Sequence, residues 1–165
     1  GFELSNFYKM DIEIYDKLFS SGESAFHGMK YYILSLHSKN QERKIEVEEY
    51  GKKFLKYDEF DNLEQSEIKK KGGKSGLKLN SDELKLWGHL SIDVQKKISL
   101  YKYKNSQLVR DVLQKTKGKV LIHPAMRMNI KKVPNCLWEG RYIKEENKII
   151  GRNMLGEIWM NIRDS

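Results

Sequence analysis

The stretch GESAFHGMKYYILSLH, residues 22–37, carries the clearest helical pattern in the chain and decides the fold class. Its apolar side chains recur at helical spacing and make one face for a core, formed by Ala25, Met29, Tyr32, Ile33 and Leu36. At about 100° per residue, Glu23 and Lys30 lie roughly 20° apart around this helix, with His27 close to both. The stripe is either a solvated face or a carboxylate and an amine that face one pocket. Periodicity alone does not choose between them.

The bulk composition suits one folded domain. The chain has 165 residues, of which 39% are hydrophobic and 11% aromatic, enough for a sizeable core. Cys136 is the only cysteine, which excludes an intramolecular disulfide and a cysteine zinc cluster. We therefore expect a single domain over 1–165.

The charge balance favours anionic partners without requiring them. The net charge of +8 comes from 31 Lys and Arg against 23 Asp and Glu, and such a field attracts phosphates, nucleotides and nucleic acid. The richness in Lys, Asn and Ile is equally explained by an AT-rich genome. With no signal peptide and no apolar run near 18 residues, we expect a cytoplasmic protein that has no membrane partner.

The N-terminal segment 2–21 has the pattern of a small β-sheet. FELSNFY is expected to be short and extended, MDIEI alternates apolar and polar residues, YDK can turn, and LFSS can return as a hairpin. Ser20 or Ser21 is expected to cap the helix that follows, from about Glu23 to His37.

The rest of the chain is predicted to be mainly helical. We expect helices over 40–57 (interrupted by Gly51), 61–71, 80–105 (as two helices divided near Gly88 and 91–93), 106–116, and from near Gly151 onward. Asn80 or Ser81 caps the third of these, with Glu83 near the capping-box position. Its expected buried positions are Leu84, Trp87, Leu90, Val94, Ile98 and Tyr101. A brief strand is expected over 119–123 and irregular structure over 125–149. The prediction is an α+β domain with a small N-terminal β-hairpin.

The basic loop KKKGGKSG, residues 69–76, is not a nucleoside-triphosphate loop. That motif needs a glycine five residues before Gly73, where Ile68 stands, and an apolar strand before it. Neither is present, so a P-loop nucleoside triphosphatase is excluded.

Three separated segments match the motif order of a known family. LSNFY at 4–8, GESAFHGMKY at 22–31 and GRNMLGEIWMNIR at 151–163 occur in that order, with Trp87 and the turn WEG at 138–140 between them. The chain thereby resembles the NADAR family of YbiA-like N-glycosidases. Members show an SNF segment, an S-E-H-Y-F-Q-A-x-K-F helix, a central Trp, a W-G-x-G turn and a G-x-N-x-L-G helix start.

This resemblance implies an α+β, mostly helical enzyme that cleaves a bond between ribose C1 and a nitrogen. Its implied substrates are phosphorylated riboflavin-pathway intermediates and ADP-ribose attached to guanine. The expected partners are therefore a phosphorylated ribosyl or ADP-ribosyl substrate and, among macromolecules, ADP-ribosylated nucleic acid. The resemblance implies no cofactor and no metal.

The resemblance assigns the catalytic roles to Glu23 and Lys30. Cleavage of the C1–N bond builds positive charge on the sugar, which a carboxylate stabilises, or the carboxylate activates water. Without the resemblance, Glu23 is a first-turn acid favoured by the helix dipole. Lys30 can hold a phosphate, lower the pKa of the carboxyl group, or attack the opened sugar aldehyde as an amine. The alternative is that Lys30 is an exposed surface lysine with no role in a site.

Four further side chains are predicted to bind substrate. The Asn6 amide can bond a base or a ribose hydroxyl, and the Phe7 ring can stack on a base or fill the core. Trp87 and Trp138 can sandwich a base or ribose. Trp87 at helical spacing also suits the core, whereas Trp138 lies in an irregular segment beside Gly140, which favours a site role.

The third family segment adds Gly151 and Asn153 to the predicted binding residues. A helix start opened by glycine offers free N–H groups to phosphate, and Asn153 can hold the ribose or fix the loop. Tight helix packing at Gly151 and Gly156 is an equal alternative. Glu139, immediately after Trp138, can replace an acid that the family carries two positions further on.

Three positions depart from the family pattern. Ser24 stands where the family has His, His27 where it has Gln, and His123 where an acid is frequent. These departures leave two alternatives open. One is a non-catalytic module that binds ADP-ribose or a nucleotide. The other is a basic nucleic-acid-binding domain, which no recognised reading helix or aromatic signature supports.

Overall fold

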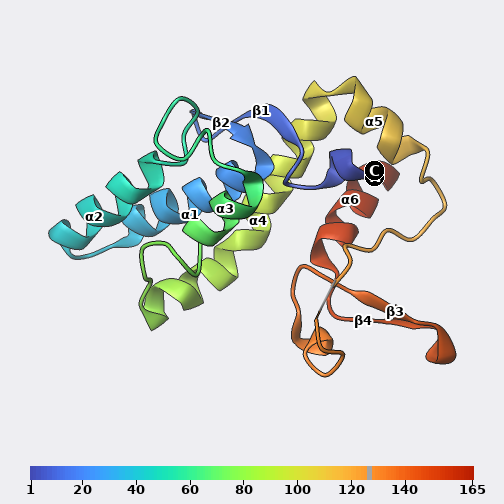
Figure 1. The fold of residues 1–165 in the computed structure, drawn as a ribbon. Helices are drawn as coiled ribbons and strands as arrows, with labels where there is room; N and C mark the ends of the chain where they lie inside the picture. The colour runs from blue at the N-terminus through green and yellow to red at the C-terminus, as the bar shows by residue number, and fades with distance from the viewer. Residues whose placement is uncertain (126–127) are drawn as a thin grey trace. The chain divides into compact units, whose positions relative to one another are not determined.

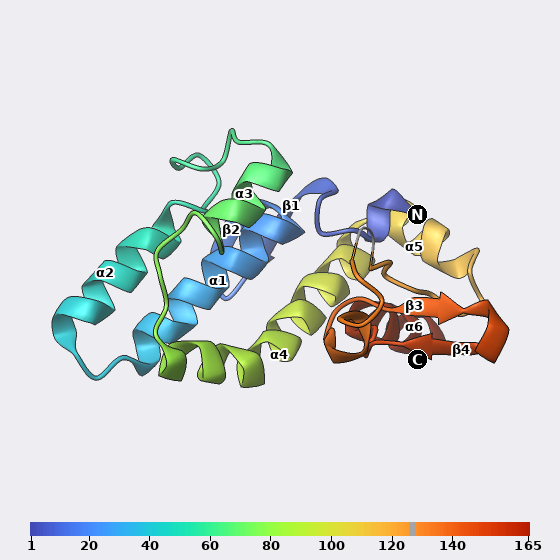
Figure 2. The same cartoon turned by 60° about the horizontal axis from the view of Figure 1, so that its bottom comes forward.

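The computed structural model describes residues 1–125 and 128–165, which form two compact units, Gly1–Asn105 and Ser106–Ser165. Within the described residues, each unit combines helices with one two-stranded antiparallel hairpin (Figures 1 and 2). The predicted class is confirmed: the protein is α+β and mainly helical, with a small N-terminal hairpin. That the two units make a single domain stays a prediction.

The first unit opens with a short 3-10 helix, Phe2–Leu4, and the hairpin β1 (Lys9–Ile14) and β2 (Lys17–Ser21). The extended structure predicted for residues 2–8 is therefore wrong at Phe2–Leu4. The hairpin turn falls on Tyr15 and Asp16, which both have positive φ, as a two-residue turn requires. Alternation along the strands buries one face of the hairpin, which carries Ile12, Ile14 and Phe19.

Helix α1 (Gly22–His37) follows the hairpin directly and is the centre of this unit (Figure 1). The Ser21 hydroxyl caps it by accepting the Ser24 backbone N–H at 3.1 Å. Ala25, Met29 and Tyr32 lie in the core as predicted, whereas Leu36 is 72% exposed. The predicted burial of Leu36 is wrong because it lies in the last turn of α1, beyond the residues that pack on this face.

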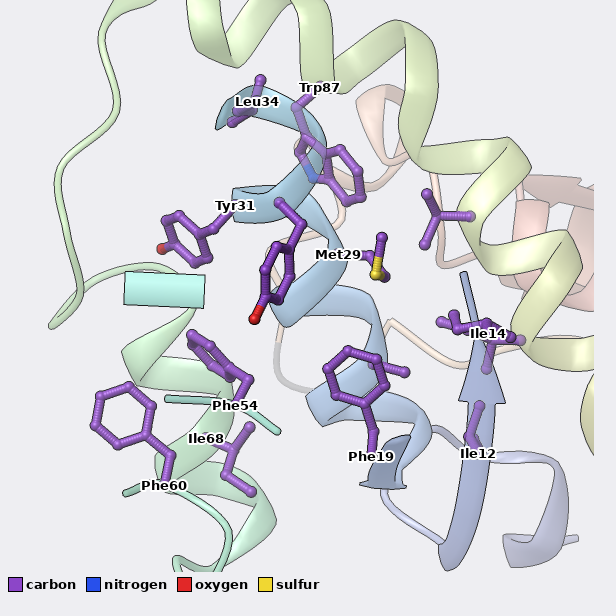
Figure 3. Close-up of a cluster of buried hydrophobic side chains, with 14 of the residues drawn as sticks. Ile12, Ile14, Phe19, Met29, Tyr31, Leu34, Phe54, Phe60, Ile68 and Trp87 are labelled. Carbon is purple, nitrogen blue, oxygen red and sulfur yellow. The ribbon is translucent and has the colours of Figure 1, made fainter. Parts of the chain in front are cut away.

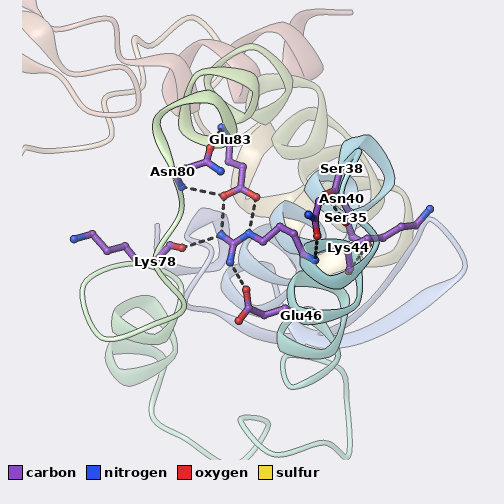
Figure 4. Close-up of polar contacts among 9 residues, drawn as sticks. Ser35, Ser38, Asn40, Lys44, Glu46, Lys78, Asn80 and Glu83 are labelled. Carbon is purple, nitrogen blue, oxygen red and sulfur yellow. Dashed lines mark hydrogen bonds and ion pairs between the residues drawn. The ribbon is translucent and has the colours of Figure 1, made fainter.

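Helix α2 (Gln41–Lys52) is tied to the start of α4 (Ser81–Asn105) by an ion pair. The Arg43 guanidinium reaches both carboxylate oxygens of Glu83, at 3.0 and 2.7 Å (Figure 4). Glu83 also accepts the Asn80 backbone N–H at 2.9 Å, and the Asn80 side chain accepts the Glu83 N–H at 2.8 Å. The predicted capping box is confirmed, with Asn80 as the cap. Helix α2 ends at Lys52, short of the predicted 57.

Helix α3 (Gln65–Lys71) is shorter than the predicted 61–71, and α4 is one unbroken helix. The predicted division of α4 near Gly88 is wrong. Gly88 is exposed, and a glycine inside a helix costs only about 1 kcal/mol. The burial of Trp87, Val94 and Ile98 on one side of α4 outweighs that cost. Leu84, expected to be buried, is 56% exposed.

The core of this unit lies among α1, the hairpin, α4, α3 and the segment after α2 (Figure 3). Phe54 is fully buried, and its ring stacks on Tyr31 at 5.7 Å between centroids. Phe60 meets Phe54 edge to face at 5.1 Å. At Gly28 of α1, an added Cβ would lie 2.5 Å from the Phe19 ring. The close approach of β2 to α1 therefore depends on this glycine.

The second unit contains α5 (Gln107–Gln114), the hairpin β3 (Arg141–Ile143) and β4 (Lys148–Ile150), and α6 (Met154–Asp164). Two short 3-10 helices, Val133–Asn135 and Lys144–Glu146, complete it. The predicted irregular stretch 125–149 thus contains a hairpin, and its residues 126–127 lie outside the described residues. The predicted strand 119–123 does not form. The chain there makes only an isolated bridge, from Pro124 to Gly140. Helix α6 begins three residues after the predicted Gly151.

The helices of residues 1–125 and 128–165 include none that combines the length and the apolar character needed to cross a membrane. The longest, α4, has 25 residues, but charged side chains occur along it.

The aromatic core predicts a large cost for truncating Phe54. We expect Phe54→Ala to lower the free energy of unfolding by about 3–5 kcal/mol, because a fully buried ring is removed and leaves a cavity. Leu36→Ala, on the exposed end of α1, should change it by less than about 0.5 kcal/mol. Denaturant unfolding of the two variants measures both values. Equal losses would contradict this assignment of the core.

Candidate functional site

The stripe on the first half of α1 is a buried polar cluster. Glu23 and Lys30 are each only 7% exposed, and the imidazole of His27 lies between them. Nε2 of His27 is 2.8 Å from Oε1 of Glu23, and Nδ1 of His27 is 3.4 Å from Nζ of Lys30. The predicted solvated face is therefore wrong, because both side chains are buried, whereas a shared pocket for substrate stays a prediction.

The hydrogen bonds of this cluster are donated in one order, from Lys30 to His27 and from His27 to Glu23. A carboxylate only accepts hydrogen bonds, so Nε2 of His27 carries the ring proton and donates to Glu23. Nδ1 then accepts from the Lys30 amine, which also donates to the backbone carbonyl of Gly72. Each member of the cluster therefore has a partner of the correct type, as burial requires.

The surroundings of the cluster are apolar and shift its pKa values. Burial lowers the pKa of Lys30 to about 8, and the negative charge of Glu23 opposes this effect. Burial also lowers the pKa of His27, against its hydrogen bond and attraction to Glu23. The imidazole lies beside the rings of Phe26 and Phe54, at 5.4 and 6.2 Å between centroids. The site thus holds a neutral imidazole and an amine that titrates near neutral pH.

The basic loop 69–76 borders this cluster. It begins in the last turn of α3, and Gly72 packs so closely on His27 that an added Cβ would lie 2.2 Å from the ring. The Gly72 carbonyl accepts the Lys30 amine, and the positive charge of Lys69 contributes to the lowered pKa of His27. The side chains of Lys69 and Lys74 are exposed.

Asn6 lies at the start of α1, where it helps to place Glu23. Its backbone carbonyl accepts the Glu23 N–H at 2.9 Å. Its side-chain amide exchanges two hydrogen bonds with Gln95 of α4, at 2.7 and 3.1 Å. An added Cβ at Gly22 would lie 2.6 Å from the Asn6 side chain. Asn6 therefore positions the start of the site helix through its backbone.

The two predicted aromatic contacts of this unit differ in burial. Trp87 is 9% exposed, and its ring meets Phe26 edge to face at 5.1 Å, so the core alternative describes it. Phe7 is half-buried in the loop between the first 3-10 helix and β1. Its N–H donates to the Ser5 hydroxyl at 3.1 Å.

The other four predicted site residues belong to the second unit. Asn153 is buried, and its side chain accepts the His123 N–H at 2.8 Å and donates to the Leu121 carbonyl at 2.7 Å. These contacts agree with the alternative in which Asn153 fixes the loop. Trp138 and Glu139 are half-buried, and Gly151 has φ +82°, which favours glycine.

The start of α6 uses its N–H groups within the second unit. The N–H groups of Asn153 and Met154 donate to the carbonyls of Glu139 and Leu137, at 3.0 and 2.9 Å. The predicted free N–H groups for phosphate are therefore occupied by the 137–139 segment. At Gly156 an added Cβ would lie 2.3 Å from the Leu121 carbonyl, which supports the alternative of tight packing.

The structure thus brings Glu23, Lys30 and the backbone of Asn6 together. His27 was not among the predicted catalytic residues, and Gly72 was not predicted to contribute to the site. The Glu–His spacing of four residues was the available signal for His27. No sequence signal pointed to Gly72, because a backbone carbonyl is the group that bonds the amine.

A second buried amine lies in the same unit and was also missed. Lys102, in the last turn of α4, donates to the Ser5 carbonyl at 2.8 Å, and burial lowers its pKa to about 7. This contact holds the N-terminal segment on α4.

A cavity of about 500 Å³ opens between the hairpin turn, α1 and α4. It is lined mainly by Tyr15, Ile33, His37, Leu90, Asp93 and Lys97. It includes neither Glu23 nor Lys30. Among residues 1–125 and 128–165, no group of three or more His, Cys, Asp and Glu side chains is placed to hold a metal ion.

Comparison with known proteins adds no assignment. No protein-family model matches the chain, and no curated protein sequence matches it. Membership of the NADAR family therefore stays a prediction.

The geometry of the cluster predicts the titration of Lys30. We expect its side chain to titrate near pH 8 in lysine-labelled protein followed by NMR, because burial disfavours the ammonium form. In Glu23→Gln the midpoint should fall further, since the carboxylate charge that favours the ammonium is gone. A midpoint near the ordinary lysine value of about 10.4, or one unmoved by Glu23→Gln, would contradict this geometry.

Proposed function

We propose that the protein is an N-glycosidase that hydrolyses a ribose C1–N bond in a phosphorylated ribosyl or ADP-ribosylated compound, with Glu23 and Lys30 as catalytic residues. The observation that carries the proposal is the buried Glu23 carboxylate, aligned by His27 and lying in one cluster with an amine of lowered pKa. Buried ionisable groups with shifted pKa values gather at catalytic sites.

The carboxylate supplies what this reaction demands. As the C1–N bond breaks, the sugar ring becomes cationic, and a fixed carboxylate in an apolar setting stabilises that charge more strongly than one in water. The same carboxylate takes a proton from the attacking water. The His27 N–H holds Glu23 in one orientation for both steps.

Lys30 has two chemical roles open to it at neutral pH. With a pKa of about 8, part of its population is a neutral amine, which can attack a sugar aldehyde. The remaining ammonium form attracts phosphate. Both roles require the substrate to reach the Lys30 amine beside the Gly72 carbonyl.

The basic loop supports a phosphate-bearing substrate. Lys69 and Lys74 are exposed, and this loop adjoins the cluster through Gly72. Lysines bind phosphates as flexible point charges. A nucleotide, ADP-ribose or a modified nucleic-acid strand meets that requirement.

The test replaces Glu23 by its neutral isostere. We expect Glu23→Gln to lower turnover of ADP-ribosylated guanine, or of a riboflavin-pathway ribosyl intermediate, by at least about 10²-fold, because the stabilising charge and the base are both lost. Product release followed by chromatography measures it.

Glu42→Gln is the matched control, because Glu42 is the exposed first-turn acid of α2. It should turn over substrate like the parent protein. Full activity in Glu23→Gln would overturn the mechanism. Tight binding of ADP-ribose by calorimetry, with no product from the parent protein, would identify the non-catalytic module instead.

A further inference from the structure

The imidazole of His27 connects the two proposed catalytic groups. It lies between the Lys30 amine and the Glu23 carboxylate, with one ring nitrogen turned to each. Asn and Gln amides make the same pair of contacts, one as donor and one as acceptor. Only an imidazole can also give a proton at one nitrogen while it takes one at the other.

We propose that His27 relays protons between Lys30 and Glu23. In one coupled transfer, a proton leaves the Lys30 ammonium for Nδ1 of His27, and the proton on Nε2 leaves for Oε1 of Glu23. The ring ends neutral, as it began. The pair changes from ammonium and carboxylate to neutral amine and carboxylic acid, and no proton enters or leaves the cluster.

Both end states satisfy every group in the cluster. Before the transfer, Lys30 donates to Nδ1 and Nε2 donates to Glu23. Afterwards, Nδ1–H donates to the lone pair of the amine, and the Glu23 hydroxyl donates to Nε2. The Gly72 carbonyl accepts an amine N–H in both states. Because no buried group loses its partner, the transfer carries no desolvation penalty of that kind.

The environment keeps the ring neutral, which the relay requires. The charged groups that act on His27 are Glu23 and Lys30 from α1 and Lys69 from α3. Burial beside Phe54 is the main effect that opposes protonation of the ring, and the charges of the two lysines add to it. The attraction of Glu23 is thereby outweighed, and the pKa of His27 falls below its ordinary value.

The relay has a use in the reaction, and this use rests on the proposed function. It gives Glu23 a proton for the leaving nitrogen and frees the amine of Lys30 in the same event. The leaving nitrogen takes the Glu23 proton as the C1–N bond breaks, and the attacking water returns a proton to Glu23. Below the pKa of Lys30 the site therefore contains the proton that the relay moves, held as the Lys30 ammonium before the transfer.

His27→Gln tests the relay because it keeps both hydrogen bonds and removes the proton transfer. We expect kcat to fall about 10²-fold with KM within about twofold. In mixtures of light and heavy water, the parent kcat should fall along a curve, since two protons move, and that of His27→Gln along a straight line. His27→Phe loses both hydrogen bonds as well as the proton transfer. Its kcat should therefore be lower still, and the difference from His27→Gln measures the contribution of positioning.

The outcomes distinguish the relay from the proposed function. Parental kcat in His27→Gln would overturn the relay and leave the glycosidase intact. If the parent protein shows no turnover, the proposed function fails. The relay is then tested separately by nitrogen NMR of His27 in the parent protein, which reports the protonation state of the ring. A neutral ring protonated mainly at Nε2 at pH 7 supports it, and an imidazolium overturns it. This measurement also stands if a His27 variant fails to fold.

Discussion

The buried amine of Lys30 is the constraint on which the site depends. A lysine ammonium removed from water needs acceptors within reach, and the chain supplies the Gly72 carbonyl and the ring of His27. Each acceptor fixes a further part of the structure. Gly72 brings the end of α3 against α1, and His27 in turn orients Glu23. The proposed catalytic groups are thus placed by the need to satisfy one charge.

The chemistry of the site follows from the same burial. Desolvation lowers the pKa of Lys30 to about 8 and lowers the pKa of His27, so the cluster combines a neutral imidazole with an amine that loses its proton more readily than an exposed lysine. The start of α1 adds the Ser21 cap and the Asn6 carbonyl, which fix the first turn and therefore Glu23. Helix α1 acts as a rigid support for the proposed glycosidase.

Local rules in the sequence predicted much of the first unit. The turn within 15–17, the helix from about Glu23 to His37 and the cap at Asn80 or Ser81 with Glu83 were predicted because each depends on neighbours within a few residues. Several features that were not predicted depend on contacts between residues far apart in the sequence. Helix α4 continues through Gly88 because Trp87 and Val94 are buried against the rest of the unit. The hairpin β3–β4 was missed because its strands have three residues each, too few to show alternation. Gly72 was missed because its contribution to the site is a backbone atom.

The Gly72 carbonyl has a consequence for how this region tolerates change. The acceptor of the Lys30 amine belongs to the main chain, so this contact does not itself depend on the exposed side chains of the 69–76 loop. The number of residues between Ile68 and Gly72 is not free, because an insertion or deletion there would present a different carbonyl. Related sequences should therefore preserve the length of the 68–72 segment.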